Sequence, residues 1–107
     1  IRLTPDKQVI KADGRSLSFV AVEVVDEKGN LCPWAENNIY FSLTGDATIA
    51  GVDNGSPFSM ERFKAHERHA FFGKCLVVIQ SGKTPATISL TAKGVDLESQ
   101  TIEIKSK

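Results

Sequence analysis

Two cysteines are the first candidates for chemistry, and their positions decide whether they could form a disulfide. Cys32 lies in a turn-rich segment before the third predicted strand, and Cys75 begins a later strand in which Val77 and Ile79 share its face. In the predicted order of strands these positions fall at opposite ends of the domain, farther apart than the ~7 Å between Cα atoms that a disulfide spans. We therefore expect two thiols that are not linked, with Cys75 buried like a small apolar side chain.

Two histidines are the next candidates, because His66 and His69 flank Glu67 and Arg68 and could ligate a metal ion. On a strand, side chains three positions apart point to opposite faces, so the two imidazoles could not share an ion. On a helix they could, but two ligands do not make a site without a Cys, an Asp or a third His nearby. The pattern favours a solvated loop, and we expect neither a metal nor any other cofactor.

Trp34 is the single tryptophan and follows Pro33 in a segment rich in turn residues. An exposed aromatic at one end of a domain can stack on a sugar ring, cover the end of the core or pack against a neighbouring domain. Glu36, Asn37 and Asn38 follow closely and could fix sugar hydroxyls, although such Asn and Glu residues are also common turn formers. We expect Trp34 to be at least partly exposed and to bind no simple sugar appreciably.

Asp53 and Asn54 precede Gly55 and could offer oxygen ligands to a cation. The segment lacks the series of carboxylates and the late bidentate Glu of an EF-hand loop, and an Asx-turn leading into glycine explains it. Trp34, Asp53 and Asn54 are therefore the candidate ligand-binding residues. No residue is a candidate for catalysis, because no nucleophile lies beside a base and no pair of carboxylates can be assigned to a shared cleft.

The charge balance excludes two classes of partner. The chain holds 13 Lys and Arg and 13 Asp and Glu residues, so its formal net charge is zero. Nucleic acids and anionic membranes favour proteins with a basic excess, so neither is an expected partner. No apolar run is long enough to cross a bilayer.

The segments that must position these residues alternate in hydrophobicity with period two, the pattern of strands with one buried face. Turn residues interrupt them at roughly the 8–12-residue spacing of a sandwich, which gives about seven to eight strands and predicts an all-β, immunoglobulin-like β-sandwich. The stretch from Phe58 to Phe72 fits a helical turn, a loop or an edge strand. The expected core residues are Val20, Val22, Val24, Ile39, Phe41, Leu43, Val77, Ile79, Ile88 and Leu90.

The length of 107 residues suits one domain, so residues 1–107 are expected to form a single domain. Because strand-like sequence begins at once and stops abruptly at Lys107, we expect this domain to be excised from a larger protein.

Several segments resemble known domains. Residues 20–30, VAVEVVDEKGN, and 73–81, GKCLVVIQS, resemble strands of the bacterial immunoglobulin-like domains of invasin-type adhesins and many glycosidases. A longer series resembles the C-terminal domain of family 2 glycoside hydrolases, the β-galactosidase-like enzymes of gut Bacteroides and relatives. In order, its segments are ADGRSLSFVAVEVVD, GNLCPWAENNIYFSLTG, IAGVDNGSP, ERFKAHERHAFFGKCLVVIQS and ISLTAKG. This resemblance runs from Ala12 to about Ile104, and its most specific part extends from IAGVDNGSP to GKCLV.

The resemblance implies a non-catalytic accessory module of a β-galactosidase-like glycosidase. In such enzymes the catalytic glutamates belong to a separate (β/α)₈ barrel, none of whose motifs occurs here, so no catalytic residue is carried over. The implied partners are the other domains of the same chain, and the implied location is the periplasm, the cell surface or the exterior. Two alternatives remain open: a carbohydrate-binding module that uses Trp34 and residues 53–57, and an adhesin-type spacer.

Overall fold

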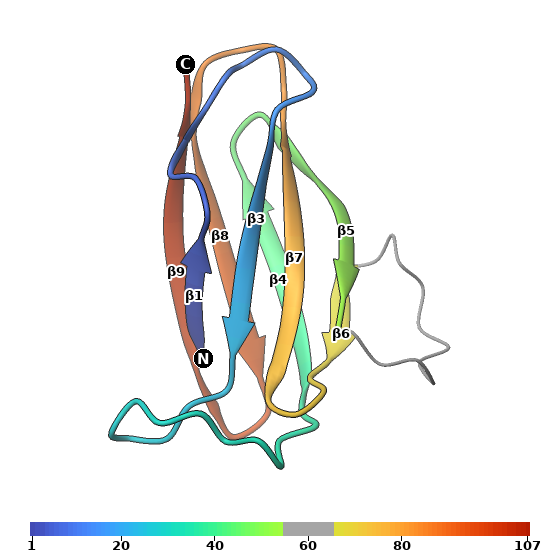
Figure 1. Ribbon diagram of the computed structural model, residues 1–107. Helices are drawn as coiled ribbons and strands as arrows, with labels where there is room; N and C mark the ends of the chain where they lie inside the picture. Colours follow the sequence, from blue (N-terminus) through green and yellow to red (C-terminus); the bar gives the residue numbers. More distant parts are fainter. Residues whose placement is uncertain (55–65) are drawn as a thin grey trace.

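The computed structural model describes residues 1–54 and 66–107, which form two sheets packed face to face (Figure 1). The first sheet contains, in spatial order, β1 (Arg2–Pro5), β3 (Leu17–Glu23), β7 (Lys74–Ser81) and β5 (Ala47–Asp53). The second contains β2 (Val9–Ile10), β9 (Leu97–Ser106), β8 (Ala86–Gly94), β4 (Asn38–Thr44) and β6 (Glu67–His69). The predicted all-β, immunoglobulin-like sandwich is confirmed. The described part has nine strands rather than seven to eight, because β2 and β6 are only 2 and 3 residues long.

The chain changes sheets between its first two strands. β1 pairs with β3 in the first sheet, whereas β2 pairs in parallel with β9 in the second. Asp6 stands at the crossing, where its carboxylate accepts the Phe19 amide at 2.8 Å. The buried Ser18 hydroxyl donates to the Lys7 carbonyl at 2.7 Å, so the one polar side chain that β3 turns inward is bonded. The crossing ties the edges of the two sheets together.

The core lies between the sheets and follows the alternation of the strands. In β3, Val20 and Val22 are buried while Phe19 and Ala21 face outward. Nine of the ten predicted core residues are buried, and Leu43 is half-buried against the same cluster. None of the described segments forms a helix that is long and apolar enough to cross a membrane.

The two ends of the sandwich carry different connections. We call the lower end in Figure 1 the Trp34 end, since it holds residues 24–37, 70–73 and 95–96 and the N-terminus. The upper end, called the Lys107 end, holds residues 11–16, 45–46 and 82–85 and the C-terminus.

The expected separation of the two cysteines is wrong. The Cys32 amide donates to the Val24 carbonyl at 2.8 Å, and the Val24 amide donates to the Gly73 carbonyl at 2.8 Å. Cys75 follows Gly73 at the start of β7, so both cysteines lie at the Trp34 end. The reason is the direction of β6, which runs antiparallel to β4 toward this end, so that β7 begins there. No disulfide joins them; Cys32 is half-buried and Cys75 is buried.

Candidate functional site

Three connections at the Trp34 end are bonded into one surface. The Gly73 amide donates to the Ala35 carbonyl at 3.1 Å, and the Ala70 amide donates to the Asn37 carbonyl at 2.9 Å. The Asn37 side-chain amide reaches the Val95 carbonyl at 3.4 Å. The β3–β4 connection is therefore held against both the β6–β7 and the β8–β9 turns.

Each of these connections exposes one large apolar side chain. Trp34 is 77% exposed, Phe72 is 64% exposed and Val95 is 74% exposed. The predicted exposure of Trp34 is thus confirmed. We call these three residues the apolar patch. Sequence patterns singled out Trp34 alone, because isolated Phe and Val residues in polar turns carry no signal that they lie together.

Phe72 is a bulky residue at a turn position that requires a positive φ. Phe71 and Lys74 exchange two backbone hydrogen bonds of 2.8 and 3.1 Å, which leaves Phe72 and Gly73 as the central residues of a two-residue hairpin turn. Both have positive φ, 52° and 78°. Such turns favour Asn-Gly or Asp-Gly, because a bulky side chain is strained in the left-handed region. Glycine is required at position 73, where a Cβ would lie 2.3 Å from the Cys32 carbonyl oxygen.

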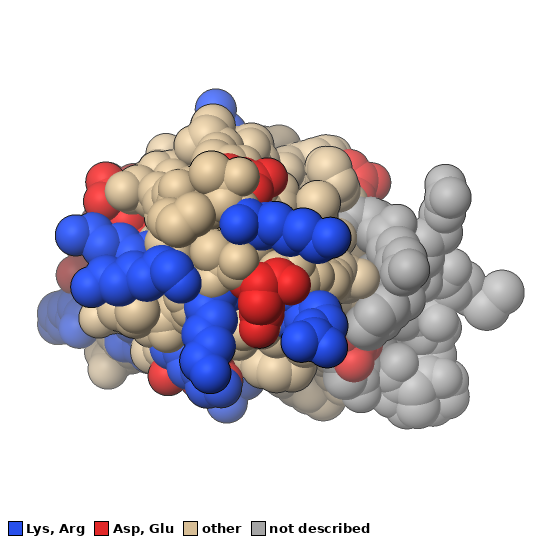
Figure 2. Space-filling view, turned by 90° about the horizontal axis from the view of Figure 1, so that it is seen from above, with Lys and Arg blue, Asp and Glu red and all other residues tan. Residues whose placement is uncertain are grey.

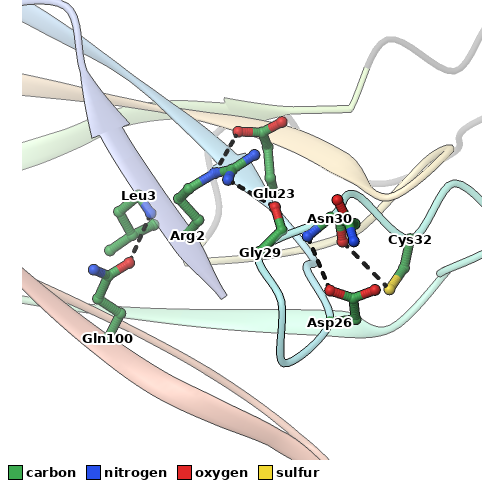
Figure 3. A network of polar contacts seen from close by, with 8 residues as sticks. All are labelled: Arg2, Leu3, Glu23, Asp26, Gly29, Asn30, Cys32 and Gln100. Carbon is green, nitrogen blue, oxygen red and sulfur yellow. Dashed lines mark hydrogen bonds and ion pairs between the residues drawn. The ribbon is translucent and has the colours of Figure 1, made fainter.

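The rest of the β3–β4 connection is ordered by polar contacts (Figure 3). The Asp26 carboxylate accepts the Lys28 and Asn30 amides, both at 2.9 Å. The bond from the Asn30 amide is the largest cause that holds the pKa of Asp26 below its ordinary 3.8. The Arg2 guanidinium pairs with Glu23 at 3.1 Å and donates to the Gly29 carbonyl at 3.0 Å. This side of the connection is built from turn chemistry and needs no ligand.

An open groove of about 1060 Å³ lies beside the apolar patch, between residues 25–30 and 96–100. Ile1 also lines it, and the Ile1 amine donates to the Glu98 carbonyl at 3.3 Å. Its charged lining residues are Asp26, Glu27, Lys28, Asp96 and Glu98. The groove is therefore acidic on balance, with four carboxylates against Lys28 and the Ile1 amine.

Asp53 and Asn54 lie at the end of β5 and form local contacts. The Asp53 carboxylate accepts the Asn54 amide at 2.8 Å, and the Asn54 side chain donates to the His69 carbonyl at 2.8 Å. These contacts tie β5 to β6, as turn formers at a strand end do. None of them reaches the connection that carries Trp34. The remainder of the predicted loop, from Gly55, lies outside the described residues.

The interpretation of residues 66–69 as a solvated loop is wrong. Glu67–His69 form β6 at the edge of the second sheet, and Arg68 at its centre is only 3% exposed. Its guanidinium donates to the Val52 carbonyl at 2.9 Å and so links the two sheets. Sequence reasoning missed this role, because an arginine within a polar run gives no sign of burial. His66 and His69 are exposed, and within residues 1–54 and 66–107 no three His, Cys, Asp or Glu side chains are placed to hold a metal.

Comparison with known proteins gives consistent matches. The family described as glycoside hydrolase family 2 C-terminal domain 5 matches residues 1–103. The β-galactosidase BoGH2A of Bacteroides ovatus is 54% identical over 107 residues, which are 100% of this chain and 13% of that protein. A β-glucuronidase of Formosa agariphila is 28% identical over 96 residues, 89% of this chain and 10% of that protein. The crystal structure of a family 2 glycosyl hydrolase from Bacteroides cellulosilyticus superposes with a TM-score of 0.97 at 43% identity, covering 99% of this chain and 14% of that one.

Proposed function

This chain belongs to the C-terminal domain 5 family of family 2 glycoside hydrolases, and from that premise we propose that it is a non-catalytic accessory domain of a hydrolase acting on β-galactosides. The observation that carries the proposal is the 54% identity to the Bacteroides ovatus β-galactosidase over the whole chain. The β-glucuronidase match is weaker, at 28% identity. Because the chain spans 13% of that β-galactosidase, the bond-breaking residues are expected elsewhere in the polypeptide.

The carboxylates support a non-catalytic role. Glycoside hydrolysis needs a general acid whose pKa is raised, so that it holds a proton near neutral pH. Asp13 and Asp26 have shifted pKa values, and backbone amides lower both. The carboxylates around the groove face an open surface rather than a closed cleft.

Activity measurements test this proposal. The purified 107-residue domain should release no product from an aryl β-galactoside, whereas the full-length protein should hydrolyse it in preference to the matching aryl β-glucuronide. Turnover by the domain alone, abolished by replacing one of its carboxylates, would refute the non-catalytic role. A preference for the glucuronide would refute the substrate and leave the accessory role intact.

The partners and the location follow from the same proposal. The partners are other domains of the same polypeptide, and the protein works in the periplasm, at the cell surface or outside the cell. The location rests on the resemblance to Bacteroides glycosidases, and fractionation of the source cells with an antibody to this domain tests it.

Carbohydrate binding is the second candidate function, favoured by the exposure of Trp34. An aromatic face suits the apolar face of a sugar ring, but a sugar site also needs polar groups aimed at the hydroxyls. The Asn37 amide is bonded to the Val95 carbonyl, and the Asn54 amide is bonded to the His69 carbonyl. These two amides therefore serve the fold, which makes the accessory role the better supported one.

A further inference from the structure

Three of the six large apolar side chains that are exposed in the described part of the domain lie at one end. They are Trp34, Phe72 and Val95, and the hydrogen bonds among their connections hold them on one surface. The other three, Val9, Phe19 and Tyr40, belong to three different strands. Single exposed apolar residues need no explanation, whereas a cluster marks a contact surface. Tryptophan is also a residue type enriched at the centres of protein interfaces.

Phe72 adds an argument that is independent of clustering. Its φ of 52° places a bulky side chain in the left-handed region, where asparagine or glycine would be less strained. Among the described residues the ring gains little in return, since it is mostly exposed and its ring contact there is with Phe71, at 4.5 Å between centroids. Backbone strain of this kind clusters at functional sites, which makes Phe72 a candidate contact residue.

The position of the N-terminus indicates what covers the patch. Ile1 lies at the Trp34 end, and its amine contacts the carbonyl of Glu98, three residues from Val95. The matched family is described as a C-terminal domain, and its Bacteroides relatives are about seven times longer than the matched part. The polypeptide that precedes the matched part in those relatives therefore enters beside the apolar patch.

We propose that the apolar patch of Trp34, Phe72 and Val95 is the docking surface for the domain that precedes this one in the full-length polypeptide. This inference rests on the proposed accessory role. The complementary surface is apolar opposite Trp34 and basic opposite the acidic groove, because four carboxylates line that side. The Lys107 end and the outer faces of the sheets stay free of this partner.

Phe72→Asn distinguishes docking from folding, because it should stabilise the isolated domain but weaken its contact with the preceding domain. In the isolated 107-residue chain, which has its own closed core, asparagine relieves the strain and should raise the melting temperature by about 2–5 °C. In the full-length protein the same change removes an aromatic ring from the interface. Amide hydrogens in residues 24–37, 70–73 and 95–96 should then exchange about tenfold faster than in the unmodified full-length protein.

A pair of matched valine variants locates the surface. Val95→Ser should accelerate exchange at the Trp34 end of the full-length protein, and Trp34→Ala should do so more strongly. Both should leave the melting temperature of the isolated domain roughly unchanged. Val9→Ser makes the same chemical change at an exposed valine on β2, close to the Lys107 end, and should change neither measurement.

Three outcomes would overturn the docking surface. Equal exchange of the three connections in the isolated and full-length proteins would show that nothing covers them. Concentration-dependent dimerisation of the isolated domain, abolished by Trp34→Ala, would identify a second copy as the occupant, and protection induced by galactose or lactose would identify a sugar.

Equal exchange at the Trp34 end can arise in two ways, which separate the two proposals. If amide hydrogens on another face of this domain exchange more slowly in the full-length protein, the docking surface is wrong and the accessory role stands. If no face is protected, the accessory role fails too.

Discussion

Carboxylates bind turn amides at both ends of the sandwich, yet of the described connections only those at one end expose large apolar side chains. At the Lys107 end, carboxylates satisfy the turn amides: Asp13 accepts the Arg15 and Ser16 amides at 2.9 and 2.7 Å, and Asp46 accepts the Thr84 amide at 2.9 Å. The Trp34 end uses Asp26 in the same way, but it also exposes a tryptophan, a phenylalanine and a valine.

Charge separates the two ends as well. Figure 2 looks down on the Lys107 end and shows Lys and Arg side chains gathered over it, with fewer acidic ones between them. The exposed cations in the connections of this end and at the C-terminus are Lys11, Arg15, Lys83 and Lys107. The Trp34 end carries the acidic groove instead. The formal net charge is zero, yet basic side chains gather at the Lys107 end and acidic ones line the groove at the Trp34 end. Composition alone could not predict this uneven distribution of charge.

The largest expected effect is at Gly73, where the β6–β7 turn lies directly against the β3–β4 connection. Gly73→Ala should destabilise the isolated domain by about 2–4 kcal/mol, because φ is 78° and the new Cβ would meet the Cys32 carbonyl oxygen at 2.3 Å. Gly29→Ala is the control: φ is 81°, but the nearest atom is 3.9 Å away, so about 1 kcal/mol is expected. Urea unfolding of both variants measures the difference. Equal losses would mean that the close approach of the two connections is not rigid.

A valine pair then measures what each region contributes to folding. Val22→Ala in β3 should cost about 1–3 kcal/mol, since Val22 is fully buried between the sheets. The same change at Val95 should cost close to nothing in the isolated domain, because that side chain is mostly in solvent already. A comparable loss of unfolding free energy at Val95 would show that the apolar patch belongs to the domain's own core. The two ends would then not differ in exposed apolar surface.

The period-two alternation was enough to predict the sandwich and its core, because burial on one face of a strand is a local property of the sequence. The alternation alone was sufficient to predict the burial of Val20, Val22, Ile39 and Ile79. The relative placement of Cys32 and Cys75 was missed, because it depends on the direction of β6, a strand of 3 residues. Arg68 was missed for a related reason, since its burial comes from the edge where the two sheets meet.

The candidate site could be predicted only in part. The exposure of Trp34 could be predicted from its place after Pro33 in a segment rich in turn residues. Its neighbours Phe72 and Val95 lie 38 and 61 positions away in the sequence, and turn residues carry no periodic pattern to relate them. Asp53 and Asn54 were predicted as possible ligands from residue type alone, and their described hydrogen bonds serve the β5–β6 contact.

The Lys107 end should respond to acid through Asp13. Backbone amides, with that of Arg15 first, lower the pKa of this carboxyl from 3.8 to about 2. A depressed pKa contributes stability that is present above 3.8 and is lost as the pH falls toward 2. The melting temperature of Asp13→Asn should therefore lie below that of the unmodified domain at neutral pH, and the gap should narrow toward pH 2. A gap that stays constant across this range would show that the ionised carboxylate contributes no more than a neutral acceptor.

The smallest expected effect concerns Trp34 and sugars, and it decides what the exposed aromatic is for. A saturable sugar site would require the indole to stack on a ring while nearby polar groups bind the hydroxyls. The Asn37 side chain instead bonds the Val95 carbonyl, and Asp53 and Asn54 bond β6 and the local backbone. Titration of the isolated domain with galactose, lactose and plant-polysaccharide oligomers should therefore leave the Trp34 fluorescence unchanged up to millimolar ligand. Because Trp34 is the single tryptophan, the signal reports on this position alone. A saturable shift that disappears in Asn37→Ala, with the fold intact, would assign the Trp34 end to carbohydrate and remove the contrast from which the docking surface is inferred.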